Sequence, residues 1–313
     1  MKKPSLLLLL ILLPLGGIFH IGSIKCFAQP GDAAASADQN MNAALSKVTL
    51  ENTELKLLHS KQVNSGYKLY ISLPKGYKES QKPYPVVYLL DADYSFAIAK
   101  NIADHLSELN NLAELIIVGI AYEDPAEYRL NRTRDYTPTR SLIGGYGPEY
   151  QKYSGGGEKF KAFIRDELVP FIDANYHTTA ERTLVGHSYG GLFGGWVAFT
   201  TPELFSSYIL VSPSLWYDNR LMFRLEERFA VGRKDKELPV KLFLSVGSRE
   251  INSQSNMVED LEKFYDQITA RSYSSLATQI IIFDDETHNS IFPAALTRGL
   301  RYIYGIGSWV EAN

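Results

Sequence analysis

Cysteine is almost absent from this chain, since its 313 residues include only Cys26. A single cysteine excludes a disulfide scaffold and a zinc site built from thiolates. A strong charge of one sign is also missing: 32 lysines and arginines stand against 35 acidic residues, and no basic tract could neutralise several phosphates in a row. We therefore expect no nucleic acid among its partners.

The rest of the composition is that of an ordinary globular protein. Glycine (23 residues) and proline (14) are near average usage, which excludes collagen-like and low-complexity chains. Hydrophobic residues make up 45% of the chain, enough for a sizeable core. The length predicts one large domain or two small ones.

The apolar run at the N-terminus is typical of an export signal. Two lysines precede the apolar residues 6–15, and Ala28 is a small residue at which signal peptidase would cut. A lipid anchor on Cys26 is the alternative, but Lys25 stands where such a site needs a small residue. The run is too short to span the ~30 Å of a bilayer core comfortably. We expect residues 1–28 to be a cleaved signal peptide, the protein to be periplasmic or secreted, and no stable membrane insertion.

Cleavage after Ala28 would change the composition of the mature chain. It removes the cysteine, three lysines and no acid, which leaves 29 basic and 35 acidic residues and a net charge of −6. A cysteine-free chain suits an oxidising compartment. Residues 29–46 lack apolar periodicity and predict a flexible linker, so the folded domain is expected at 47–313.

Short apolar runs alternate with amphipathic stretches along this domain. Residues 67–73 alternate in period two, which predicts a strand, and the short apolar runs 86–90, 115–120, 208–211, 240–246 and 279–283 predict strands buried on both faces. Apolar residues three or four apart predict helices at 98–109, 160–168 and 258–268. Alternating strands and helices predict an α/β fold with a mostly parallel central sheet and helices on both faces.

The connection at about 123–158 is much longer than the ~2–6 residues that are usual in such folds. It leaves the carboxyl end of a strand, the edge where open α/β sheets bind ligands. Guanidinium groups bind carboxylate and catecholate oxygens through paired donors. We therefore expect Arg132 and Arg134, together with Tyr136 of the same segment, to contact substrate. The alternatives are a decorated surface loop and local pairing of these arginines with acids such as Asp135.

Residues 186–190 read Gly-His-Ser-Tyr-Gly, a G-x-S-x-G pentad. The pattern places Ser188 on a sharp turn from strand to helix, a nucleophile elbow, and presents its hydroxyl above the sheet. An apolar strand precedes the pentad and a glycine-rich helical stretch follows it, which favours Ser188 as a nucleophile. His187 precedes the nucleophile, so we expect it to be structural.

A serine nucleophile needs a base, an acid and two donors for the oxyanion. His288 is the histidine downstream of Ser188, in the order serine, acid, histidine, and is predicted as the base. Glu250, in the turn after the run 240–246, is the preferred acid. The alternative acids are Asp218, Asp284 and Asp285.

The oxyanion donors are expected at two turns. One is the backbone N–H of Tyr189, and the other is that of Asp93 or Ala92, in a turn after the run 86–90 whose carboxylates are expected to be turn formers. Trp216 leaves the end of another strand, where it could wall an acyl pocket or belong to the core.

Several longer motifs resemble one family. Residues 88–93 (Tyr-Leu-Leu-Asp-Ala-Asp), 134–139 (Arg-Asp-Tyr-Thr-Pro-Thr), 163–173, the pentad and 212–216 (Ser-Pro-Ser-Leu-Trp) are together similar to the putative-esterase family of α/β-hydrolases, which includes esterase D and the trilactone siderophore esterases. The likeness runs from about residue 63 to 303. It implies an α/β-hydrolase catalytic domain at 47–313 and an ester hydrolase that uses Ser188, Glu250 and His288, with no metal and no other cofactor.

Two details of this resemblance bear on the predicted site. The segment 134–139 resembles the siderophore-esterase branch most, and members of that branch can dispense with a well-placed acid. Ala92 stands where a glycine is common.

We expect an exported serine esterase that acts through an acyl-enzyme on a small-molecule ester, of siderophore type or another polar or aromatic ester. The alternatives are an acyltransferase with the same site and a non-catalytic binding module; the sequence does not predict the oligomeric state.

Overall fold

The computed structural model describes residues 48–232, 237–251 and 255–307, almost all within one compact unit, Leu50–Asn313. The expected signal peptide (1–28) and linker (29–46) lie outside the described residues, so these two expectations stay predictions.

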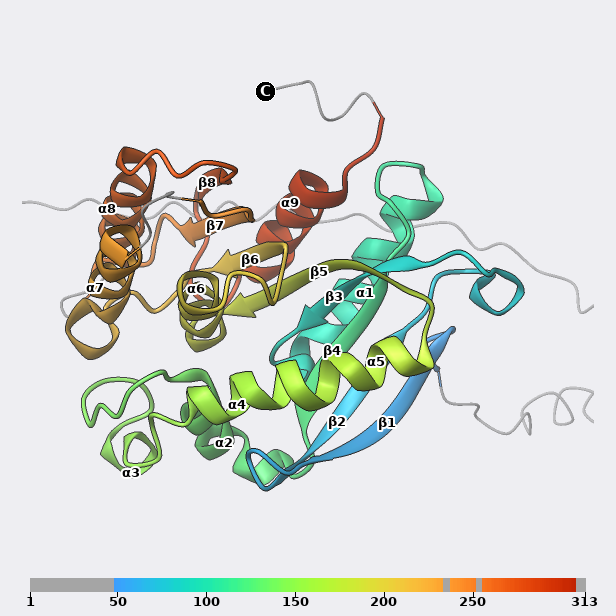
Figure 1. The fold of residues 1–313 in the computed structure, drawn as a ribbon, viewed down its shortest axis with the longest axis horizontal. Coiled ribbons are helices and arrows are strands. Elements are labelled where there is room, and N and C mark those ends of the chain that lie inside the picture. Colours follow the sequence, from blue (N-terminus) through green and yellow to red (C-terminus); the bar gives the residue numbers. More distant parts are fainter. Residues whose placement is uncertain (1–47, 233–236, 252–254, 308–313) are drawn as a thin grey trace, which may run out of the picture. The chain divides into compact units, whose positions relative to one another are not determined.

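Eight strands form one sheet in the order β1-β2-β4-β3-β5-β6-β7-β8 (Figure 1). Strand β2 pairs antiparallel with both of its neighbours, β1 and β4, and the other pairings of the described sheet are parallel. The bounds are β1 Thr53–Ser60, β2 Ser65–Ser72, β3 Tyr84–Leu89, β4 Ile116–Tyr122, β5 Thr178–His187, β6 Ser207–Val211, β7 Lys241–Gly247 and β8 Ala277–Phe283. The expected mostly parallel sheet is confirmed.

Helices cover both faces of this sheet (Figure 1). One face packs against α1 (Ala92–Glu108) and α9 (Phe292–Tyr304). The other packs against α4 (Gly157–Phe163), the π-helical η3 (Ile164–Leu168), α5 (Val169–Asn175), α6 (Tyr189–Thr200), α7 (Tyr217–Gly232) and α8 (Met257–Ala270). Because successive strand residues point to opposite faces, strands β2 to β8 contribute side chains to both hydrophobic clusters, which gives the α/β layering expected from the sequence.

The edge strands depart from the expected pattern. All six predicted strands are present, but β8 is only partly buried, since Ile282 is 38% exposed. The expectation that every run is buried on both faces is wrong there, because β8 has a neighbour on one side only. At the other edge, β1 was not predicted. Its Leu55 and Leu57 are exposed, so the strand lacks the apolar face that marks a core strand.

The segment at 123–158 is not a simple loop. It contains η2 (Pro125–Glu127), α2 (Tyr128–Tyr136) and the short α3 (Pro148–Gln151), and α4 begins at Gly157. Helix α2 escaped prediction because much of what it buries is polar or charged rather than apolar. Its buried residues are Asn131, Arg132, Thr133, Asp135 and Tyr136.

Candidate active site

Ser188 occupies the turn between β5 and α6, with φ 59° and ψ −114°. The flanking glycines are required by close approach of the backbone: a Cβ on Gly186 would lie 2.3 Å from Gly190 backbone atoms, and one on Gly191 would lie 2.9 Å from Pro213 Cα. The Ser188 N–H donates to the Val211 carbonyl at 2.9 Å, which ties the turn to β6. The pentad thus forms the strained elbow that its pattern predicts.

Glu250 and His288 follow the two neighbouring strands β7 and β8, and their side chains meet. His288 Nδ1 lies 2.6 Å from Glu250 Oε2. The other carboxylate oxygen, Oε1, accepts from the Ser212 hydroxyl at 2.5 Å and from the Gly247 N–H at 2.8 Å. Three hydrogen bonds therefore fix a carboxylate whose side chain is 1% exposed, while the imidazole is 36% exposed.

The alternative acids have other partners. Asp218 accepts from the Thr139 hydroxyl at 2.7 Å, Asp284 lies 3.4 Å from the Ser248 hydroxyl, and Asp285 pairs with Arg249. Glu250 is the acid whose contact with His288 is present in the structure. The geometry favours Glu250, although the role of each residue stays a prediction.

Ser188, His288 and Glu250 line one cavity of about 1400 Å³. Ser188 Oγ lies 3.4 Å from Ser214 Oγ at its floor. Aromatic rings form much of the wall, and Trp216 lies among them, so the structure places it at the cavity rather than wholly in the core. The aromatic lining residues are Tyr94, Tyr128, Tyr146, Tyr189, Trp216 and Phe292.

The two residues expected to give the second oxyanion donor do not line this cavity. Ala92 begins α1 and is buried close to Gly119: a Cβ added to Gly119 would lie 2.8 Å from the Cβ of Ala92. Asp93 is exposed. The next residue, Tyr94, does line the cavity. The expected donor is a backbone N–H group, and Ala92 and Asp93 open helix α1, whose first N–H groups have no acceptor within the helix. Their role as the second oxyanion donor therefore stays a prediction.

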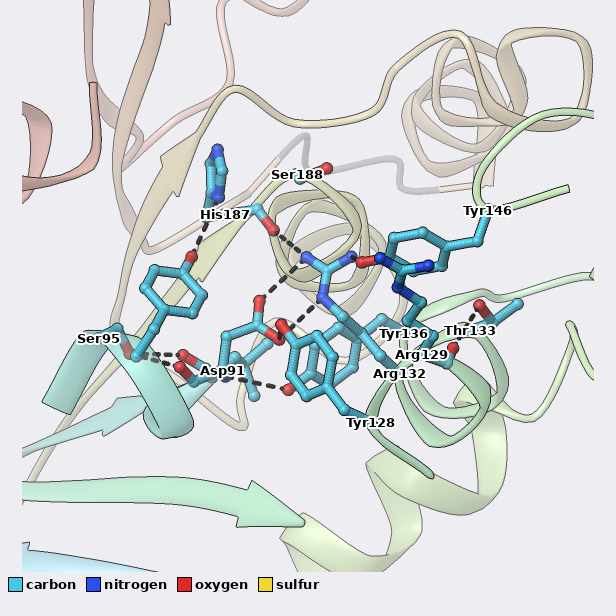
Figure 2. A network of polar contacts seen from close by, with 12 residues as sticks. Asp91, Ser95, Tyr128, Arg129, Arg132, Thr133, Tyr136, Tyr146, His187 and Ser188 are labelled. Carbon is cyan, nitrogen blue, oxygen red and sulfur yellow. Dashed lines mark hydrogen bonds and ion pairs between the residues drawn. The ribbon is translucent and has the colours of Figure 1, made fainter. Parts of the chain in front are cut away.

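Arg132 lines the cavity but uses its donors within the protein (Figure 2). Its Nε and Nη2 donate to the two carboxylate oxygens of Asp91 over 2.8 and 3.0 Å, and Nη2 also donates to the His187 carbonyl at 2.8 Å. Nη1 donates to the Tyr146 hydroxyl at 3.3 Å. Burial acts to lower the pKa of Arg132, but Asp91 holds it well above its usual value, so the guanidinium stays charged.

Arg134 and Tyr136 lie off the cavity, which corrects the expectation that they contact substrate. Arg134 donates through Nε and Nη2 to Asp135, its neighbour in α2, and Asp135 also accepts from the Tyr67 hydroxyl. Tyr136 is 1% exposed and packs in the core, where its hydroxyl accepts from the Asp91 N–H. Arg134 is two residues from Arg132 and so points to a different side of α2. Tyr136 is one turn on from Arg132, and its ring lies against the guanidinium, 5.4 Å from Cζ to the ring centre, within the core.

The arginines that line the cavity are paired. Three arginines line it, each with a carboxylate partner: Arg132 with Asp91, Arg220 with Asp260, and Arg249 with Asp285. Among the described lining residues, an anionic substrate therefore meets no guanidinium that lacks a carboxylate. The expected arginine cluster for anionic esters is not supported.

His187 lies beside the predicted base. The ring centroids of His187 and His288 are 4.6 Å apart, and a hydrogen bond of 3.1 Å joins His187 Nδ1 and the Tyr94 hydroxyl. Burial, with further contributions from His288 and Arg132, lowers the pKa of His187 well below its usual value. A neutral, packed imidazole fits the structural role expected for His187.

Sequence reasoning missed several residues of this site, above all Asp91, Tyr94 and Ser212. Ser212 opens the motif Ser-Pro-Ser-Leu-Trp directly after β6, and Asp91 follows β3 in the same way. Their position at the carboxyl ends of parallel strands was the available signal, because those ends meet at the edge that carries Ser188.

This chain is similar to several known proteins. The model of a family described as "Putative esterase" matches residues 60–292. The ferri-bacillibactin esterase BesA of Bacillus subtilis (strain 168) is 30% identical over 274 residues, which cover 85% of this chain and 94% of that protein. The siderophore enterobactin esterase of Emericella nidulans is 27% identical, over 77% of this chain and 90% of that protein. Among solved structures, an IroE-like serine hydrolase from Shewanella oneidensis matches with a TM-score of 0.72 at 30% identity, over 80% of each chain.

Proposed function

This chain belongs to the putative esterase family of α/β-hydrolases and is an ester hydrolase, and on that premise we propose that it cleaves esters through an acyl-enzyme on Ser188. The observation that carries the proposal is the 2.6 Å contact between Glu250 and His288 in the cavity that also contains the Ser188 elbow. Glu250 orients the imidazole through Nδ1, which leaves Nε2 to serve Ser188.

The reaction has two steps. In the first, the Ser188 hydroxyl passes its proton to His288 as Oγ bonds the ester carbonyl carbon, and the C–O bond to the alcohol breaks as His288 returns a proton to that alcohol. In the second, water loses a proton to His288, attacks the acyl carbon and releases the acid, and Ser188 regains its proton. The Tyr189 N–H begins α6 and has no acceptor within that helix, so it is available to the oxyanion.

The substrate proposed is a bulky ester of siderophore type with aromatic groups. A cavity of about 1400 Å³ exceeds the ~300–1,000 Å³ of most small-molecule sites, and its tyrosine and tryptophan wall suits stacked aromatic acyl groups. Two of the relatives named above are called a ferri-bacillibactin esterase and a siderophore enterobactin esterase, which supports a substrate of this class here. Because the cavity arginines are paired, recognition rests on the aromatic wall more than on the net charge of the substrate.

A substrate panel tests this function. We expect hydrolysis of p-nitrophenyl esters of different chain length and a higher kcat/KM for a catecholate trilactone. Added alcohol should divert little product into a new ester, whereas an acyltransferase would transfer much of the acyl group to that alcohol. Absence of ester hydrolysis across the panel would contradict the function, and hydrolysis of short esters alone would contradict the siderophore class.

Export remains part of the proposal, supported by the pattern of residues 1–28. Within the described residues, no helix combines the length and apolar character needed to cross a membrane. N-terminal sequencing of natively expressed protein should give a chain that begins at or near Gln29. Retention of Met1, or a lipid on Cys26, would overturn export by this signal.

A further inference from the structure

The guanidinium of Arg132 reaches both chain neighbours of Ser188. Nη2 donates to the His187 carbonyl at 2.8 Å (Figure 2), and Cζ lies 5.6 Å from the centre of the Tyr189 ring. Between these two residues, Ser188 has a positive φ of 59°. Such a conformation costs about 1–3 kcal/mol in a residue other than glycine and persists only where its surroundings hold it.

The same guanidinium is bonded to the turn after β3. Asp91 has a φ of 56° and accepts from Arg132 through both carboxylate oxygens. Two tyrosines hold Asp91 in turn: the Tyr128 hydroxyl donates to Oδ1 at 2.9 Å, and the Asp91 N–H donates to the Tyr136 hydroxyl at 3.1 Å. Arg132 thus connects two strained turns at the carboxyl ends of the neighbouring strands β3 and β5.

The ion pair between Asp91 and Arg132 is almost fully buried. The side chain of Arg132 is 5% exposed and that of Asp91 is 1% exposed. Arginine keeps its proton throughout the range in which enzymes work, and its planar fork matches a carboxylate in a single geometry. A buried group of fixed charge and fixed shape is suited to holding atoms in place, and it is unsuited to moving a proton.

We propose that the Asp91–Arg132 pair is a positioning device that sets the distance between the Ser188 turn and the turn after β3. The inference rests on the proposed function, since it assigns a role in the reaction of Ser188. In α/β-hydrolases one oxyanion donor follows the nucleophile and the other comes from the loop after β3. By bonding both turns, Arg132 fixes the oxyanion site before substrate arrives. Displacement by ~1 Å can cost ~10²-fold in rate.

This role predicts a kinetic signature that differs from substrate contact. An arginine that binds part of the substrate affects KM, and only for substrates that carry that part. A positioning arginine affects kcat for every ester, because each ester forms the same oxyanion. A purely structural pair lowers the melting temperature without altering kcat per folded active site.

The test is the double variant Asp91→Asn/Arg132→Gln, which removes both charges so that neither is buried alone. On a short neutral p-nitrophenyl ester and on a catecholate trilactone, kcat per active site should fall ~10²-fold, with KM within ~3-fold of the wild type. The pH at which kcat is half-maximal should not move, because His288 and Glu250 are intact. Arg132→Lys keeps the charge but lacks the fork, and it should lose at least ~10-fold in kcat on both esters.

Arg271→Gln is the matched control. Arg271 also pairs with a fully buried carboxylate, Glu226, at a place that does not line the cavity. This variant should lower the melting temperature and leave kcat within ~2-fold of the wild type.

Two results would overturn the positioning role: kcat within ~3-fold of the wild type in the double variant, or a loss confined to KM on one ester. If the double variant does not fold, the same criteria applied to Arg132→Lys decide the question. Ser188→Ala separates this inference from the proposed function. Activity retained in Ser188→Ala contradicts the proposed function, whereas an inactive Ser188→Ala beside fully active Arg132 variants contradicts the positioning role alone.

Discussion

Two carboxylate–base pairs contact the turn that carries Ser188, and they differ in burial and in chemistry. Asp91–Arg132 reaches the His187 carbonyl and is at most 5% exposed, whereas Glu250–His288 lies against the His187 ring and leaves the imidazole 36% exposed. Arginine cannot release its proton, whereas an imidazole can accept and release one. The difference separates positioning from proton transfer: one pair can only hold geometry, and the other can exchange a proton with a reacting group.

Breaking the proton-transfer pair should give the largest effect. His288→Ala is expected to lower kcat by at least ~10³-fold, because the Ser188 hydroxyl then has no base, and Ser188→Ala should do the same. Steady-state kinetics on a p-nitrophenyl ester measure this, with circular dichroism to verify folding. A loss under ~10-fold in His288→Ala would mean that another group accepts the proton.

The acid of the same pair should matter less than the base. Glu250→Gln is expected to lower kcat by at least ~10²-fold but by less than His288→Ala, because an amide no longer fixes the imidazole tautomer. Asp218→Asn and Asp284→Asn are the matched controls and should stay within ~3-fold. If Glu250→Gln keeps nearly full activity while one of these controls does not, the acid is wrongly assigned.

Arg134 sharpens the comparison, because it is two residues from Arg132 and also pairs with a buried carboxylate, Asp135. Burial is the main cause that raises the pKa of Asp135 above its usual value, so removing its partner leaves a poorly solvated acid. With the Arg134 side chain 25% exposed, Arg134→Gln should cost about 2 kcal/mol of unfolding free energy, less than a fully buried pair. Denaturant titration measures this, and kcat and KM should change less than ~3-fold on any ester. A rise in KM confined to an anionic ester would restore the substrate-contact role.

The smallest effect concerns His187 and pH. Its folded pKa is lowered well below 6.5, so the unfolded chain binds a proton that the folded one does not once the pH falls below about 6.5. The unfolding free energy should therefore fall with decreasing pH, by up to ~1.4 kcal/mol per unit, until the folded pKa is reached. In His187→Gln this contribution disappears, so the difference between wild type and variant should change between pH 7.5 and 5.5. Parallel curves would contradict the shift.

Much of this site could be predicted because parallel strands end at one edge. Ser188, Glu250 and His288 follow β5, β7 and β8, so their order along the chain and their place after apolar runs bring them together before any side-chain contact is known. The strands themselves were predictable for a different reason, because their apolar runs are short and bounded.

The second pair could not be predicted in this way. Arg132 and Arg134 look alike in sequence, and which one faces the site depends on how α2 packs, a helix whose buried residues give no apolar stripe. Asp91 looked like a turn former, and only its tertiary contacts reveal the ion pair. Strand β1 was missed because its leucines Leu55 and Leu57 are exposed, so its sequence shows neither the buried apolar pattern of a core strand nor the polar pattern of an edge strand.

Covalent mapping of the nucleophile tests the central claim most directly. A fluorophosphonate probe should label the folded protein, and peptide mass spectrometry should place the adduct on Ser188, with no adduct in Ser188→Ala and labelling slowed in His288→Ala. An adduct on another residue, or labelling that survives Ser188→Ala, would contradict the assignment of Ser188 as the nucleophile of this esterase.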